Sequence, residues 1–161
     1  MIYIIILITI IIDFLISYFI PIYFNNLNIF YPMLTLTFLI YYFKKTTNKK
    51  YLKIVLITGL LYDILFSYLF LFNTIIFLLF SKILIKIDKV IRYNYLISIL
   101  LLILFIFLYD FILFILIYIS KYNTISFYDL IYKFKNSLIL NIIFYCLLNI
   151  IINKNVLKKI K

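Results

Sequence analysis

A largely apolar run of 32 residues, from Ile54 to Ile85, constrains the fold of this chain more than any other feature. A helix rises about 1.5 Å per residue and the hydrocarbon core of a bilayer is about 30 Å thick, so about 20 residues make one crossing. The run is too long for one upright helix. We expect it to break near Leu71–Asn73 and to cross a membrane twice, with Asn73 ending a short helix, rather than once at a steep tilt.

The composition excludes most other classes of protein. The chain has 161 residues, of which 68% are hydrophobic, and no polar stretch is long enough for a soluble domain. We expect the apolar N-terminal stretch to be a retained span and not a signal peptide, because it has no basic n-region. The excess of Ile, Lys, Asn and Tyr is typical of an AT-rich genome, which indicates a bacterium.

No motif for chemistry is present in the sequence. There is no Gly-rich phosphate loop, no metal-ligand cluster and no nucleophile beside a base, and the chain has a single cysteine, Cys146. We therefore expect no enzymatic activity, no cofactor and no metal. The net charge of +11 lies in short segments between spans, so it indicates membrane orientation rather than nucleic-acid binding.

Charge also decides the number of spans. Two crossings by the central run give six spans in one integral membrane domain, at about residues 2–24, 29–43, 53–70, 72–87, 93–119 and 136–152. One side then carries 13 of the 16 basic residues, whereas a single crossing would divide them 8 against 8. Because Lys and Arg mark the cytoplasmic side, we expect a multi-pass protein of the bacterial cell (inner) membrane with both termini in the cytoplasm.

Three aspartates lie inside the expected spans, where a carboxylate is costly. They are Asp13, Asp63 and Asp110, and no Lys, Arg or His is placed at mid-span to pair with them. We therefore expect these acids to face the interior of the bundle and to stay protonated.

Other polar residues align with these acids at a spacing of four, which places them on one helix face. The stripes are Thr9-Asp13-Ser17, Gly59-Asp63-Ser67 and Ser137-Asn141-Tyr145-Asn149-Asn153. In a bilayer such stripes face other helices, because hydrogen bonds between helices stabilise a bundle.

Three interpretations of the stripes remain open. They hold the bundle together, or the three acids form a proton or cation path, or an exposed stripe receives a transmembrane helix of another protein. The candidates for helix packing or partner docking are Gly59, Asp63, Ser67, Asp13 and Asn73.

One segment resembles a known family. The run Gly59-Leu60-Leu61-Tyr62-Asp63-Ile64-Leu65-Phe66-Ser67, followed by Asn73, looks like the signature of the rod shape-determining protein MreD family. In that family a Gly-Leu-Leu-x-Asp-Leu-Leu run precedes a short break that contains glycine and then another apolar helix. This chain lacks the glycine expected near Leu71.

The resemblance extends over roughly residues 1–120. Pro32, placed before Met33-Leu34-Thr35-Leu36, resembles the proline at the head of the family's second span, and the six spans and the lysine-rich segment before the signature also fit. Asp13 stands where the family more often has a neutral polar residue.

The resemblance implies a non-enzymatic scaffold subunit of the bacterial cell-elongation (rod) complex, needed for cell shape and for coordination of peptidoglycan synthesis. The implied partners are a bitopic MreC-like membrane protein and, within the same complex, MreB, RodA and a penicillin-binding protein. The implied fold is all-α, a polytopic six-transmembrane-helix bundle similar to the substrate-binding subunits of energy-coupling-factor (ECF) transporters.

That similarity supplies an alternative function, the substrate-binding subunit of a small-molecule transporter for a vitamin or an ion. Those subunits usually dock their partner through an Ala-x-x-x-Ala motif in the first span. This chain contains no alanine, which favours the scaffold.

Overall fold

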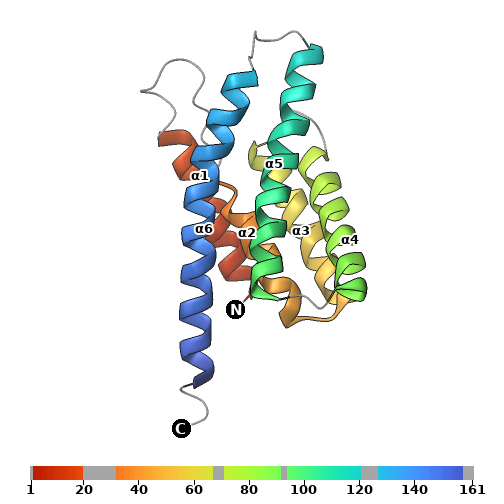
Figure 1. The fold of residues 1–161 in the computed structure, drawn as a ribbon, viewed down its shortest axis with the longest axis vertical. Coiled ribbons are helices and arrows are strands. Elements are labelled where there is room, and N and C mark those ends of the chain that lie inside the picture. The colour runs from red at the N-terminus through yellow and green to blue at the C-terminus, as the bar shows by residue number, and fades with distance from the viewer. Residues whose placement is uncertain (1, 20–31, 67–70, 92–93, 121–126, 158–161) are drawn as a thin grey trace.

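The protein is an all-α bundle (Figure 1). The structure, a computed structural model, describes residues 2–19, 32–66, 71–91, 94–120 and 127–157. The described part contains six α-helices and one 3₁₀ turn, η1: α1 (Ile2–Phe19), α2 (Leu34–Tyr42), η1 (Phe43–Lys45), α3 (Asn48–Phe66), α4 (Phe72–Val90), α5 (Tyr95–Ser120) and α6 (Phe127–Leu157).

The helices pair as consecutive hairpins around a short central helix. α1 lies against α2, α3 against α4, and α5 against α6, while α2 also contacts α5 and α6. Every residue of α2 is buried, so this nine-residue helix forms the middle of the bundle. Because a helix with no solvent-facing side cannot be amphipathic, its sequence LTLTFLIYY shows no helical periodicity of apolar residues.

Most of the outer surface of the bundle is apolar, as a lipid-facing surface requires. Large aliphatic and aromatic side chains are exposed along α1, α3, α4, α5 and α6, whereas Asp13, Asn73, Asp110 and Asn141 are buried. Two helical segments, Tyr95–Leu116 and Leu130–Ile150, are long and apolar enough to cross a membrane, and Tyr3–Phe19 is a shorter apolar helix.

The predicted break of the central run is present. α3 ends at Phe66, and α4 begins at Phe72 after Leu71, whose φ of 62° places it in the left-handed region. The two helices pack antiparallel, and the hydroxyl of Ser81 donates a hydrogen bond to the hydroxyl of Tyr51 (3.4 Å). Asn73 lies in the first turn of α4 and does not end α3, contrary to our expectation.

The starts of three predicted spans differ from the structure by five residues or more. Helix α2 begins at Leu34 rather than near residue 29, so Pro32 precedes the helix instead of occupying its first turn. Helix α3 begins at Asn48 rather than at 53. Helix α6 begins at Phe127 rather than at 136, which places Lys133 and Lys135 on a helix and not in an outer link spanning 120–136.

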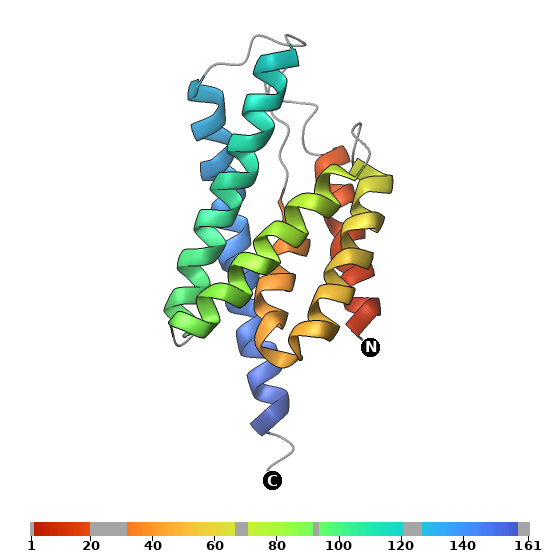
Figure 2. The same cartoon turned by 90° about the vertical axis from the view of Figure 1, so that its right-hand side faces the viewer.

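Both views show which helix ends lie together (Figures 1 and 2). The start of α1, the connection from α2 to α3, the end of α4, the start of α5 and the end of α6 all lie at one end of the bundle. We call this the basic end, because the lysines between α2 and α3 and those in the last turns of α4 belong to it.

Candidate functional site

The carboxylate of Asp13 caps the central helix. Its Oδ1 accepts a hydrogen bond from the Leu34 N–H (2.9 Å), and its Oδ2 accepts from both the N–H (2.9 Å) and the hydroxyl (2.7 Å) of Thr35. Asp13 has no exposed surface, so water cannot substitute for these bonds. The start of α2 is thus held by a side chain from the middle of α1.

Asp63 repeats the same arrangement in the next hairpin. Its Oδ1 accepts from the Asn73 N–H (2.7 Å), and its Oδ2 accepts from the N–H (3.0 Å) and the hydroxyl (2.6 Å) of Thr74. In both hairpins an aspartate of the first helix accepts from two successive N–H groups and one threonine hydroxyl of the second. We call these two arrangements the aspartate caps.

The aspartate caps provide acceptors for backbone N–H groups that would otherwise be unpaired at a helix start in an apolar medium. The first N–H groups of a helix have no intrahelical acceptor, and each unsatisfied group costs several kcal/mol in hydrocarbon. The residues preceding α2 and α4, Met33 and Leu71, are both in the left-handed region and provide no side-chain cap. A carboxylate from the neighbouring helix therefore takes the place of the usual Ser, Thr, Asp or Asn cap.

Gly59 brings α3 and α4 close enough for the second cap. A Cβ atom at this position would lie 2.6 Å from the Cα of Thr74 and 3.1 Å from its Oγ1. Gly59 precedes Asp63 by one helical turn on the same face, so the missing side chain lets Thr74 approach the carboxylate. Close backbone approach at glycine is the common use of small residues in membrane helices.

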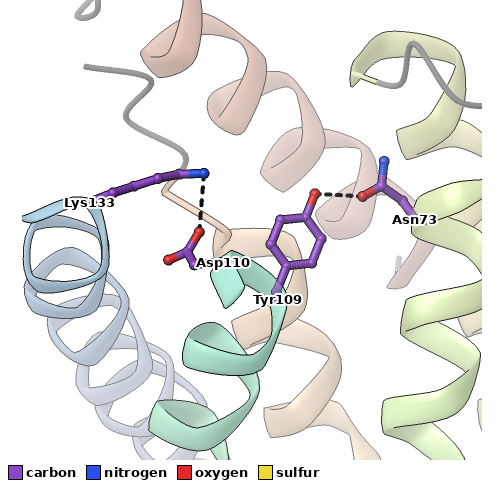
Figure 3. Close-up of polar contacts among 4 residues, drawn as sticks. All are labelled: Asn73, Tyr109, Asp110 and Lys133. Atoms are coloured by element: carbon purple, nitrogen blue, oxygen red, sulfur yellow. Dashed lines mark hydrogen bonds and ion pairs between the residues drawn. The ribbon is translucent and has the colours of Figure 1, made fainter. Parts of the chain in front are cut away.

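The third hairpin uses an ion pair in place of a cap (Figure 3). The Nζ of Lys133 on α6 lies 3.2 Å from Oδ1 of Asp110 on α5, and the Lys133 side chain is 19% exposed while that of Asp110 is buried. The prediction that no basic residue is placed to pair with Asp110 is therefore wrong. Because α6 begins nine residues earlier than predicted, Lys133 reaches the bundle.

A tyrosine links the second hairpin to the third. The hydroxyl of Tyr109, the residue before Asp110, donates to Oδ1 of Asn73 (2.7 Å), and both side chains are buried (Figure 3). Asn73 thus contacts α3 through its backbone N–H and α5 through its side chain. This places one residue at the junction of three helices.

The polar stripe of α6 also faces the interior. Asn141 Oδ1 accepts from the Thr37 hydroxyl of α2 (2.5 Å), and Ser137 and Tyr145 are buried on the same face. The Tyr145 ring lies against Tyr41 of α2, with centroids 5.9 Å apart. Asn149 is half-buried, and the side chain of Asn153 lies outside the described part.

The structure brings three of the five predicted candidates together. Gly59, Asp63 and Asn73 lie together between α3 and α4, whereas Asp13 connects α1 to the start of α2. Ser67 lies outside the described residues. Sequence reasoning missed Thr35, Thr74, Tyr109 and Lys133. Only the two threonines carried a signal, since threonine is common at helix starts.

This arrangement bears on the three open interpretations. Each of the three aspartates has its own partner within its own hairpin, and among the described residues no group of His, Cys, Asp or Glu could hold a metal. The geometry favours helix packing over a continuous path between the acids. Protonation of the aspartates stays a prediction.

The bundle has a largely apolar exterior, and its buried polar side chains form hydrogen bonds between helices. These features are typical of one class, the helical membrane proteins. The chain belongs to the rod shape-determining protein MreD family, whose family model matches residues 1–157. The family match extends through α6, whereas the resemblance seen in the sequence covered roughly residues 1–120. No curated protein and no solved structure matches the chain, so the predicted similarity to ECF subunits stays a prediction.

Membership of the family identifies a membrane protein with a role in determining rod shape. This confirms the family inferred from the Gly59–Ser67 signature. It also agrees with the lack of catalytic motifs, since the family is one of shape-determining structural proteins.

The bond between Tyr109 and Asn73 provides a local test of this network. We expect Tyr109→Phe to lower the free energy of unfolding by about 1 kcal/mol, because it removes one buried hydrogen bond. In a double-mutant cycle with Asn73→Ala, the coupling energy should be about 0.6–1.7 kcal/mol. Unfolding by SDS titration in mixed micelles measures it.

Tyr118→Phe is the control for this cycle. Tyr118 also lies on α5 but is 69% exposed, so the loss of its hydroxyl should leave stability unchanged. Strict additivity of Tyr109→Phe and Asn73→Ala would contradict the bond.

Proposed function

We propose that the protein spans the membrane six times with both termini in the cytoplasm. The basic end supports this topology, because it gathers the start of α1, the end of α6 and the connections that carry most of the lysines. The same division places 13 of the 16 basic residues on one side, as the positive-inside rule requires of short loops.

We propose further that the protein is a non-enzymatic scaffold subunit of the cell-elongation complex that helps to coordinate peptidoglycan synthesis. The family match over residues 1–157 carries this proposal. Its partner would be a bitopic MreC-like membrane protein, with MreB, RodA and a penicillin-binding protein in the same assembly. The geometry supports a scaffold, because the buried polar residues connect helices to one another.

The outer face of α3 is the proposed docking surface for the partner's transmembrane helix. Asp63 is only half-buried although it caps α4, and the adjoining Leu60, Leu61 and Ile64 are exposed, Ile64 to 78%. Gly59 and Asn73 are buried between helices, so their part would be to hold this face in place. Asp63 is therefore the candidate for direct contact, and Ser67 joins it on the sequence spacing alone.

The two aspartate caps provide a matched pair for testing this role. Asp63→Asn and Asp13→Asn each replace one cap by a side chain that still accepts a hydrogen bond, so both should weaken one hairpin to a similar extent. We expect Asp63→Asn to reduce co-purification of the MreC-like partner at least threefold and to impair rod shape. Asp13→Asn should leave both unchanged. Asp63→Leu should weaken co-purification further.

The measurement is recovery of the partner by affinity purification from cells that carry each variant in place of the wild-type protein, beside cell width by microscopy. Equal membrane levels of the two variants are required. Equal recovery from both, with normal rods, would show that Asp63 has no part in docking. Normal rods in cells that lack the protein altogether would refute the scaffold role.

A further inference from the structure

Six lysines gather where α3 begins and α4 ends. Lys49, Lys50 and Lys53 are exposed on the first turns of α3, and Lys82, Lys86 and Lys89 are exposed on the last turns of α4. The two helices run antiparallel, and the hydrogen bond between Ser81 and Tyr51 joins the first turn of α3 to the middle of α4, one residue before Lys82. We call these six residues the lysine cluster.

Within the described part of the chain, little negative charge lies beside the cluster. Asp88 is the one acidic residue on these turns, and among the described residues none of the six lysines forms an ion pair. At the opposite end of the bundle, by contrast, Lys133 pairs with Asp110. The lysine cluster is therefore available to bind anions from outside the chain.

Aliphatic side chains are exposed beside these lysines. Ile83, Val90 and Ile91 are exposed, Val90 to 83%, while Leu84 on the inner face of α4 is buried. Figure 2 shows α4 crossing the bundle obliquely toward the basic end. Exposed aliphatic residues interleaved with lysines on an oblique helix are typical of segments at a membrane interface.

We propose that the lysine cluster binds the phosphate groups of anionic lipids, such as phosphatidylglycerol, in the leaflet at the basic end. An acidic protein would match the charge equally well, but it would leave the exposed Ile83 and Val90 unexplained. The lipid chains cover them, while the lysine stems extend along apolar surface and hold their ammonium groups at the headgroup level. If the lysines acted only as orientation signals during membrane insertion, the folded protein would show no preference for anionic lipids.

Native mass spectrometry of the full-length protein tests this proposal. The purified protein is titrated with phosphatidylglycerol and, separately, with phosphatidylcholine, and the apparent dissociation constants are compared. We expect the wild type to prefer phosphatidylglycerol, and Lys82→Gln/Lys86→Gln to weaken that binding about tenfold, since each lysine near an anionic surface contributes severalfold. High salt should reduce the preference.

Lys121→Gln/Lys135→Gln is the matched control, because it removes two positive charges that do not belong to the cluster. It should retain the preference for phosphatidylglycerol. Equal loss in both double variants would show a general effect of net charge and overturn the proposal, as would no preference in the wild type. Binding of a glutamate-rich peptide without a lipid preference would assign the cluster to an acidic protein and also overturn it. None of these results depends on the MreC-like partner.

Discussion

Asp13→Leu should lower the free energy of unfolding by at least about 3 kcal/mol, the largest effect expected of a single substitution in this protein. The change leaves two N–H groups and one hydroxyl at the start of α2 without an acceptor, in a site with no exposed surface. Because α2 contacts α1, α5 and α6, the loss spreads beyond one hairpin. SDS titration in mixed micelles, followed by far-UV circular dichroism, measures it.

Asp13→Asn and Leu15→Ala are the controls for this prediction. The asparagine keeps one side-chain acceptor and should cost about 1 kcal/mol. Leu15 lies on the same helix but is exposed to lipid, so its truncation should cost less than about 0.5 kcal/mol. If Asp13→Leu were as stable as Leu15→Ala, the cap would not be what holds the start of α2.

Gly59→Ala should be the second most damaging change, with a loss of about 2–3 kcal/mol in the free energy of unfolding. The added Cβ would lie 2.6 Å from the Cα of Thr74, and a backbone atom cannot turn aside as the end of a side chain can. The two helices must separate, which lengthens the bonds from Thr74 to Asp63 as well. Alanine has the higher helix propensity, so the sign of the effect identifies the contact as its cause.

Leu60→Ala is the matched control for Gly59→Ala. Leu60 is the next residue of α3 and faces outward, so its truncation should cost less than about 0.5 kcal/mol. Gly59→Ala/Thr74→Ser should be no more stable than Gly59→Ala, since the serine keeps the Cα that collides. A neutral or stabilising Gly59→Ala would contradict the close approach of α3 and α4.

Sequence reasoning found the features that local patterns determine. The length of the run from Ile54 to Ile85 predicted the break at Leu71, because no upright helix of that length fits one bilayer. The spacing of four residues placed Asp13 and Asn141 on interior faces, as their burial shows. The Gly59–Ser67 signature indicated the family that the family model confirms.

What sequence reasoning missed depends on contacts between distant residues. Asp13 and Thr35 are 22 positions apart, and no periodicity within one helix indicates which N–H groups a carboxylate will reach. Lys133 was placed outside the bundle because the mixed polarity of its segment resembles a link, although the same residues continue helix α6. Asp13 caps α2 where it starts, at Leu34. Local helix propensity does not reveal this contact, because the two residues are 21 positions apart.

The six-span topology depends above all on the reversal of the chain at Leu71, which carries the lysines of α3 and α4 to one side of the membrane. Single cysteines at positions 49, 89 and 123, introduced into a Cys146→Ser background and labelled in intact cells with a membrane-impermeant maleimide, test this directly. We predict that position 123 is labelled, while positions 49 and 89 are labelled only after the membrane is permeabilised. Labelling of positions 49 and 89 from opposite sides would contradict the six-span topology.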